Sequence, residues 1–300
     1  MRNPSLSKLE SEYRQYLVEV RALGPASAKG YVYGFRRFCD FLKTRRVRAA
    51  RRVSLNLVYA FLEEFSRGRS RRTVRVMHAR TRSILRFLHF ARVLPRDLSK
   101  DMIAPRTWKL ADVPQAFSRK DTVRVFANLR SETPYDLRER AMVLLFVCYG
   151  LRVGEVTGMD LDDIDWRRKI ITIRQRKNRV PLILPLLPPV EEALRGYVAH
   201  SRPPDVRSKR LFVAVSHRKK ASLTKRLVAK IVAKFLHRCG LEGSANKFRH
   251  TLATRLINSG VRLEAVQAIL GHRQLESTRI YAKIHWEALR EVARNYSMFL

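Results

Sequence analysis

Apolar side chains recur every three or four positions through the first hundred residues, which is the period of a helix that buries one face. The pattern predicts four successive helices with almost no strand between them. These helices cover residues 5–20, 27–43, 54–65 and 70–91. Gly24-Pro25 separates the first two, and Ser27 is the predicted N-cap of the second. A small helical domain is therefore expected at the start of the chain.

Three prolines punctuate residues 94–115, at a spacing that forbids a continuous helix. This stretch is therefore predicted to be an extended linker, residues 95–115. It separates a first domain of residues 1–94 from a second domain of residues 116–300.

The second domain is also predicted to be mainly helical. Ser118 marks a helix start, and the strongly apolar run from Asp136 to Gly150 predicts a long helix buried on most sides. Further helices are predicted over residues 189–200, 223–237, 244–258 and 261–270, with Ser244 as the cap of the third, and a last helix starts at Ser277. In the helix after Ser244, an apolar stripe recurs every four residues.

The only clear strand signal lies at residues 169–173 and 179–185, on either side of the basic stretch 174–178. This arrangement predicts a hairpin or small sheet with a basic tip. Entry of the tip into a DNA groove and a merely solvated turn are equally open alternatives. The fold class that follows is mainly α with a small antiparallel β-sheet.

Net charge is the strongest global feature, at +36 for 300 residues with histidine neutral. The first 110 residues carry 26 Lys and Arg against 8 Asp and Glu, a net charge of +18. The remaining 190 residues also carry a net charge of +18. A basic character spread over both domains favours a polyanion that touches both, and double-stranded DNA fits best. The alternative is a basic soluble protein with no such partner.

Several other classes are disfavoured by the composition. The longest apolar run, Ala141 to Leu151, is too short to cross a bilayer, and no secretory leader is expected. A membrane-surface role is not expected either, because the charge is not concentrated on one amphipathic helix. The three cysteines are far apart among apolar neighbours, so buried free thiols are expected, with neither disulfides nor a metal site.

Arginines gather in predicted loops and helix starts, where they can reach phosphates without entering a core. Few acidic residues lie near those of the first domain, so DNA binding is preferred to a solvated surface. The predicted DNA-binding residues are Arg45, Arg46, Arg69, Arg71, Arg72, Arg75, Arg174 and Arg176.

Five residues of the second domain have the chemistry for transesterification at a DNA phosphodiester. Arg152 emerges in the most apolar part of the chain, and if buried it needs an anionic partner: Glu155, an aspartate between 160 and 165, or a DNA phosphate. Arg249, predicted at the margin of the core, is the second arginine that could clamp phosphate oxygens.

The other three groups supply protons and a nucleophile. Lys177 can protonate the leaving oxygen, His272 follows a helix-ending glycine, and Tyr281 can hold the phosphoryl group covalently. The attack is in line, so placement matters most. No Asp/Glu cluster has metal-site spacing, which disfavours two-metal chemistry and predicts no metal and no cofactor.

The order of these residues resembles the tyrosine recombinases of the phage integrase family, including integrase-like transposases and Xer-type members. The motifs that carry the resemblance are Gly150-Leu151-Arg152-Val153-Gly154-Glu155, Arg179-Val180-Pro181-Leu182, Phe248-Arg249-His250-Thr251-Leu252-Ala253-Thr254, Leu270-Gly271-His272 and Thr278-Arg279-Ile280-Tyr281-Ala282. The resemblance implies that the catalytic residues are Arg152, Lys177, Arg249, His272 and the nucleophile Tyr281. Glu155 and His250 would support them.

The same resemblance implies an architecture and a reaction. A helical, SAM-like core-binding domain would precede an α+β catalytic domain, and the two would form a C-shaped clamp around DNA. Cleavage would pass through a 3′-phosphotyrosyl link without ATP or metal. A homotetramer would act on two DNA sites, with or without a partner recombinase, in the cytoplasm at the nucleoid.

One position departs from the family pattern. Three residues before Arg249, where the family usually has a histidine that assists proton transfer, the chain has Asn246. Asparagine can bind a phosphate oxygen but cannot shuttle a proton near neutral pH. His250 points about 100° away around the helix and is a poor substitute. Asn246 therefore supports one alternative, a catalytically weak or inactive DNA-binding or architectural protein of this fold. A topoisomerase-like or resolvase activity, with the same chemistry and less strand exchange, is the other alternative that stays open.

Overall fold

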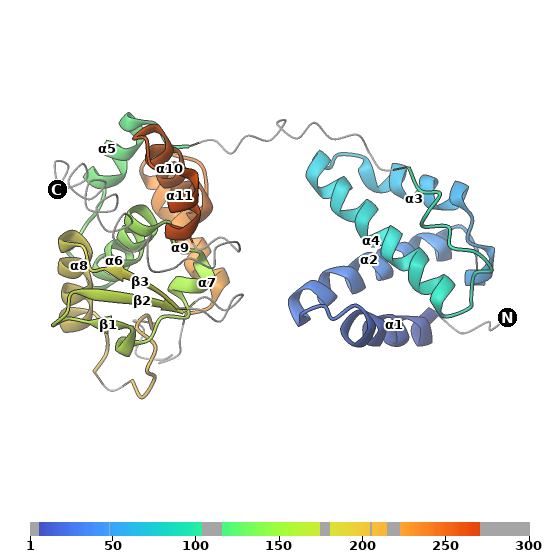
Figure 1. Ribbon diagram of the computed structural model, residues 1–300, viewed down its shortest axis with the longest axis horizontal. Coiled ribbons are helices and arrows are strands. Elements are labelled where there is room, and N and C mark those ends of the chain that lie inside the picture. Colours follow the sequence, from blue (N-terminus) through green and yellow to red (C-terminus); the bar gives the residue numbers. More distant parts are fainter. Residues whose placement is uncertain are drawn as a thin grey trace. The chain divides into compact units, whose positions relative to one another are not determined.

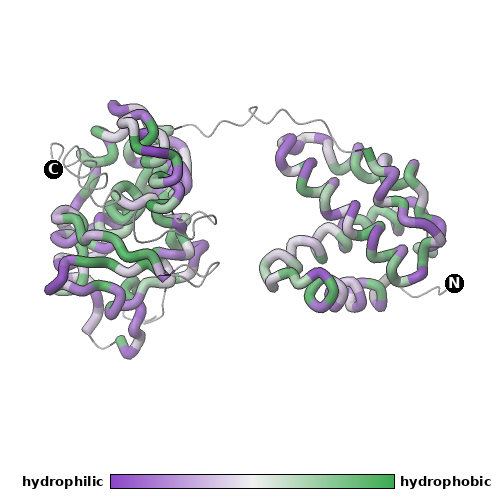
Figure 2. Tube along the Cα trace, in the orientation of Figure 1, coloured by the Kyte–Doolittle hydropathy of each residue, from purple (hydrophilic) through white to green (hydrophobic). Residues whose placement is uncertain are grey.

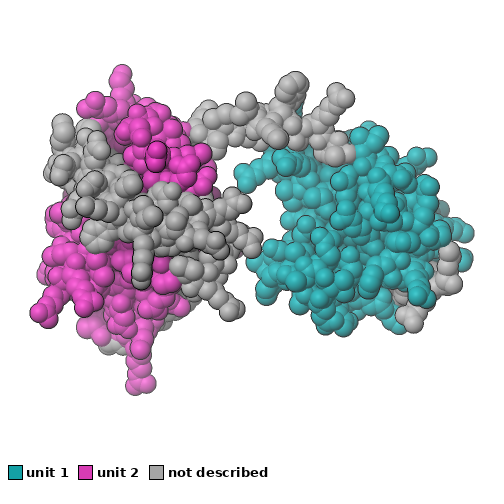
Figure 3. All heavy atoms as spheres, in the orientation of Figure 1, with its two compact units in different colours: residues 1–111 teal, residues 112–300 magenta. Residues whose placement is uncertain are grey.

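The computed structural model describes residues 6–47, 49–103, 116–174, 181–204, 206–214 and 223–270. The chain divides into two compact units, residues 1–111 and 112–300 (Figures 1 and 3). Each unit has a hydrophobic core of its own. The units are therefore described separately.

The described part of the first unit is built from helices. They are α1 (Leu6–Gln15), the π-helical turn η1 (Tyr16–Val20), α2 (Pro25–Thr44), the 3₁₀ turn η2 (Ala50–Arg52), α3 (Leu55–Ser66) and α4 (Arg71–Phe90). Ser54 and Ser70 cap α3 and α4 by accepting hydrogen bonds from the backbone N–H of Leu57 and Thr73. The four predicted helices are therefore confirmed.

The start of α2 corrects one prediction. Ser27 is not the N-cap, because the helix begins two residues earlier, with Gly24 at the N-cap and Pro25 in the first turn. Proline suits this position, since its fixed φ is helical and its missing N–H would have no partner there.

Aromatic side chains fill the core of the first unit. The buried rings of Tyr13, Phe35 and Phe87 lie 5.0 to 6.5 Å apart, joining α1, α2 and α4. The Tyr13 hydroxyl donates to Ser83 Oγ at 3.0 Å, which satisfies its buried polar end. The alternation of hydrophobic and hydrophilic residues along these helices is visible in Figure 2.

The second unit combines helices with a three-stranded antiparallel sheet of order β1-β2-β3 (Figure 1). Its helices are α5 (Arg119–Ala127), α6 (Pro134–Tyr149), α7 (Val153–Val156), α8 (Pro188–His200), α9 (Lys225–Arg238), α10 (Ala245–Asn258) and α11 (Leu263–Ile269), with one 3₁₀ turn, η3 (Leu161–Asp163). The strands are β1 (Ile164–Asp165), β2 (Ile170–Arg174) and β3 (Pro181–Pro185). The pairing of β2 with β3 confirms the predicted hairpin or sheet, whereas β1, only two residues long, gave no alternation to detect.

Helix α6 is the centre of the second unit. Ten of its residues are buried, and it packs against α8, α9 and α10. It starts before the predicted Asp136, because Thr133 is the N-cap and Asp136 completes a capping box with it. At its other end, the Tyr149 hydroxyl donates to the carbonyl oxygen of Pro185 at 2.7 Å and accepts from the Leu187 N–H at 3.0 Å. This fixes the end of α6 to the end of the sheet.

Among the described residues, no helix is long and apolar enough to cross a membrane.

Candidate active site

Arg152 stands at the junction that follows α6, as the N-cap of α7. Its guanidinium Nη1 lies 2.7 Å from Glu155 Oε1, and its backbone N–H donates to Glu155 Oε2, also at 2.7 Å. Arg152 is not buried, because 44% of its side chain is exposed, while that of Glu155 is only 11% exposed. A well-shielded carboxylate therefore holds an arginine that an outside anion can reach.

Two of the other proposed partners of Arg152, Asp160 and Asp163, belong to a different cluster. Asp160 pairs with Arg174 at 3.3 Å and with Arg210 at 2.8 Å, while Asp163 lies 2.9 Å from Arg174 Nε. Burial raises the pKa of the Asp163 carboxyl above its usual value. Arg174, predicted to bind DNA, therefore also joins the end of β2 to two aspartates that precede and end η3.

Arg249 lies deeper than predicted, inside the core rather than at its margin, with 7% of the residue exposed. Its Nη1 donates to the Gly150 carbonyl oxygen at 2.8 Å, and its Nη2 donates to the carbonyl oxygen of Leu270. A guanidinium has five N–H donors, so these two bonds fix its plane and leave donors for an anion. Burial, followed by the charge of Arg152, lowers its pKa to about 10, so it stays protonated at neutral pH.

Gly150 brings the two arginines into one place. Its φ of +60° ends α6, a conformation in which glycine is unstrained. A Cβ at this position would lie 3.1 Å from side-chain atoms of both Leu252 and Leu270, and 3.3 Å from Arg249 Cα. The end of α6 thus lies directly against α10, and Arg152 follows two residues later.

Helix α10 buries Arg249 and exposes Asn246 and His250. Phe248, Leu252 and Leu256 are buried, which confirms the predicted apolar stripe. Asn246 and His250 are both exposed, so His250 does not share the buried setting of Arg249. Ser244 occupies the N-cap position, but its side chain makes no capping hydrogen bond.

Four of the predicted site residues lie outside the described residues. They are Lys177, Arg176, His272 and Tyr281. The structure therefore brings together Arg152, Glu155 and Arg249 from the predicted set, with Asn246 one helical turn before Arg249.

The predicted DNA-binding arginines of the first unit differ in how free their charges are. Arg45 lies 3.5 Å from Glu64, and Arg69 donates to the Phe65 carbonyl oxygen at 2.6 Å. Arg46, Arg71, Arg72 and Arg75 are exposed and form no ion pair with a described carboxylate. The last three of these belong to the first turns of α4.

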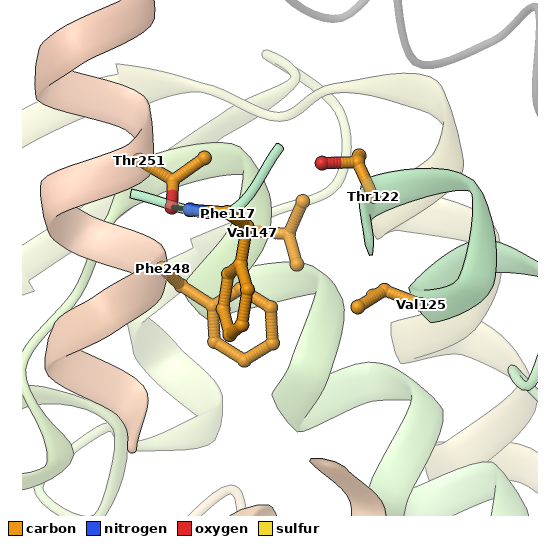
Figure 4. Close-up of a pocket in the computed structure, with 6 residues that line it drawn as sticks. All are labelled: Phe117, Thr122, Val125, Val147, Phe248 and Thr251. Carbon is orange, nitrogen blue, oxygen red and sulfur yellow. Dashed lines mark hydrogen bonds between the residues drawn. The ribbon is translucent and has the colours of Figure 1, made fainter. Parts of the chain in front are cut away.

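A small pocket beside α10 is not a second site. Figure 4 shows the rings of Phe117 and Phe248 against each other in its wall, with Thr122, Val125, Val147 and Thr251 around them. The Thr251 hydroxyl accepts from the Phe117 N–H and donates to the Lys247 carbonyl oxygen, both at 2.8 Å. The Thr122 hydroxyl donates to the Ser118 carbonyl oxygen at 3.0 Å, so both hydroxyls that line the pocket are engaged within the fold. The described residues also contain no group of three His, Cys, Asp or Glu side chains arranged to hold a metal.

Comparison with known families agrees with this geometry. Residues 116–287 match the phage integrase family, and residues 11–91 match the phage integrase N-terminal SAM-like domain. The chain belongs to the phage integrase family. As a tyrosine recombinase it is a DNA strand-transfer enzyme of site-specific recombination, which confirms the resemblance and the activity predicted from the motifs.

Similar proteins cover nearly the whole chain. An integrase/recombinase designated y4rF from Sinorhizobium fredii (strain NBRC 101917 / NGR234) is 34% identical over 95% of this chain and 68% of its own length. Tyrosine recombinase XerC from Syntrophus aciditrophicus (strain SB) is 29% identical over 96% of both chains.

Solved structures share the fold. The XerH site-specific recombinase bound to difH substrate has a TM-score of 0.68 at 19% identity, over 93% of this chain and 82% of its own. A lambda integrase dimer bound to a COC′ core site has a TM-score of 0.67 at 16% identity, over 90% and 96%. The mainly helical fold with a small antiparallel sheet and a SAM-like first domain is thereby confirmed.

Proposed function

We propose that the chain cleaves and rejoins DNA at a specific site through Tyr281, with Arg152 and Arg249 binding the scissile phosphate. The observation that carries this proposal is the arginine pair: one guanidinium is fixed by a shielded carboxylate and the other by two backbone carbonyls. Donors that are fixed before the phosphate arrives need no reorganisation when charge builds on its nonbridging oxygens.

The chemistry needs one nucleophile and one leaving-group acid. The Tyr281 oxygen would attack phosphorus in line, forming a tyrosyl–phosphate bond as the bond from phosphorus to the 5′ oxygen breaks. Lys177 would donate the proton that converts this oxygen to a hydroxyl. A phosphoester replaces a phosphoester, so a 5′-hydroxyl of a partner strand can reverse the step without ATP or metal.

A group other than Asn246 would have to accept the proton of the Tyr281 hydroxyl. An amide has no basic nitrogen near neutral pH, and the exposed His250 lies on another side of α10. We therefore assign His272 the larger part of this role, with Glu155 as the residue that positions Arg152.

The assembly we propose is a homotetramer that joins two duplex sites, with or without a partner recombinase. A lambda integrase tetramer bound to a Holliday junction has the same fold, with a TM-score of 0.66 at 15% identity. Both basic units would contact the same duplex, the first through Arg45, Arg46, Arg69, Arg71, Arg72 and Arg75, and the second through Arg174 and Arg176. The proposed division is residues 1–94, 95–115 and 116–300, and the proposed place of action is the nucleoid.

A nicked suicide duplex tests the reaction. The target sequence would first be selected from a random duplex pool by tight binding, and then nicked so that cleavage cannot reverse. Wild-type protein should form a covalent protein–DNA adduct, and Tyr281→Phe should form none while retaining its affinity for the duplex. Tight specific binding without an adduct in the wild type would overturn the assignment.

Asn246 favours a second candidate, a DNA-binding protein of this fold that cleaves weakly or not at all. Asn246→His restores a titratable ring at an exposed position of the first turn of α10, where it disturbs no core contact. Faster adduct formation in this variant is expected if the missing proton carrier limits the rate. An unchanged rate with a wild-type adduct would show that another group already carries the proton.

A further inference from the structure

Lys225, the first residue of α9, lies against Gly154 of α7. A Cβ added to Gly154 would stand 3.0 Å from Lys225 Cε and 3.1 Å from its Nζ. The end of this lysine therefore crosses the backbone of α7, two residues along the chain from Arg152. A side chain at position 154 would have to displace it.

The Lys225 ammonium forms no ion pair within the described parts of the chain, and the residue is exposed. Glu155, the carboxylate next to Gly154, is engaged twice by Arg152. Among the described residues, the positive charges of Lys225, Arg152 and Arg249 thus lie around α7, and Glu155 is the carboxylate that Arg152 engages there. Like charges brought together in this way are stabilised by a bound polyanion.

We propose that Lys225 binds a nonbridging oxygen of the DNA backbone beside the phosphate held by Arg152, and that Gly154 keeps the path of its side chain open. This inference rests on the proposed function, because it places Lys225 on the same duplex. The competing explanation is structural: the lysine methylenes merely cover α7, as long side chains often cover a neighbouring backbone.

Removing the charge while keeping the methylenes separates the two explanations. Lys225→Met has an unbranched side chain of similar length, so the packing on Gly154 is retained. For binding to the selected duplex, we expect the slope of log affinity against log salt concentration to become shallower by about 0.9, which corresponds to one phosphate contact. Lys225→Arg keeps the positive charge, so it should have the same slope as the wild type. A wild-type slope in Lys225→Met would overturn the proposal.

Lys234 provides a matched control on the same helix. It is exposed, and because it lies nine residues after Lys225 it is on the opposite side of α9. Lys234→Met should leave the slope unchanged. An equal change in both methionine variants would overturn the proposal, because it would show that only the total charge of α9 matters.

Gly154→Ala tests the path independently of the lysine charge. Its Cβ meets only the flexible end of Lys225, and alanine is a better helix former than glycine, so the melting temperature should be unchanged or higher. We nevertheless expect a shallower salt slope. Combined with Lys225→Met, the alanine should have no further effect. Additive effects would mean that Gly154 acts through something other than Lys225, which would overturn this half of the proposal.

Adduct formation on the nicked duplex keeps the two proposals apart. If the wild type forms the adduct and Lys225→Met keeps the wild-type slope, the Lys225 contact fails and the proposed reaction stands. If the wild type forms no adduct, the proposed reaction fails, and a shallower slope in Lys225→Met still supports the DNA contact.

Discussion

Replacing Glu155 by glutamine should release Arg152 from its fixed position. The carboxylate accepts from the Arg152 backbone N–H and from its guanidinium, each at 2.7 Å. Glutamine has the same size but only one oxygen, so its NH₂ group would face one of these two donors. One hydrogen bond is therefore lost and replaced by a contact between two donors.

The loss of stability follows from how exposed the pair is. A hydrogen bond to a charged group contributes about 1.5 to 3 kcal/mol, whereas an exposed ion pair contributes about 1 kcal/mol or less. Since 44% of the Arg152 side chain is exposed, we expect a cost of about 1 to 2 kcal/mol. For a unit of this size, that lowers the melting temperature by roughly 3 to 6 °C.

The effect on cleavage should be larger than the effect on stability. A displacement of about 1 Å in a group that positions the reacting phosphate can lower the rate about 100-fold. Single-turnover adduct formation on the nicked duplex measures this, and thermal unfolding followed by circular dichroism measures the stability. We expect adduct formation about 10- to 100-fold slower, at an affinity for duplex within a few-fold of the wild type.

Glu192 supplies the control. Glu192 lies on α8 and pairs with Arg140 of α6 at 3.3 Å, and its side chain is 75% exposed. Glu192→Gln removes the same charge and should change neither the rate nor the melting temperature measurably. If Glu155→Gln cleaves as fast as the wild type at an unchanged melting temperature, then Glu155 does not position Arg152.

Two further predictions concern the buried polar groups of the second unit. Thr251→Val leaves the buried N–H of Phe117 without its acceptor, so urea unfolding should show a loss of about 1 to 3 kcal/mol; a loss under 0.5 kcal/mol would contradict the role of this bond. Burial raises the pKa of the Asp163 carboxyl in the folded state above its unfolded value of about 4. Between the unfolded and the folded pKa, the folded state therefore binds more protons than the unfolded chain. The contribution of this group to stability is thus complete below about pH 4 and is lost as pH rises through the folded pKa. In Asp163→Asn this fall should be missing when unfolding free energies are compared between pH 3 and 6, and parallel curves for the two proteins would refute it.

The periodic features were predictable because they depend on local spacing. Serines at positions 54, 70 and 118 cap the predicted helices, since a hydroxyl before an apolar run satisfies the first free N–H groups wherever the helix later packs. Gly150, which ends α6, was predictable from the sequence for the same reason. The two-residue strand β1 was not, because its existence depends on pairing with β2 and not on its own residues.

The candidate site divides in the same way. Sequence order alone predicted Arg152, Arg249 and the motifs around them as site residues, because the residue types needed at a phosphate are few and occur in a recognisable order. It did not determine which carboxylate holds Arg152: Glu155 and the aspartates between 160 and 165 all stayed open, yet Asp160 and Asp163 pair with Arg174 and Arg210.

Only the tertiary structure decided how deep each charge lies. Arg152 is exposed although the residues around it in the sequence are apolar, and Arg249 is buried. The carbonyls that fix Arg249, at Gly150 and Leu270, are 99 and 21 residues away from it in the chain. Burial and long-range hydrogen bonds arise from packing between distant segments, so no local pattern records them. The approach of Lys225 to Gly154 is of the same kind.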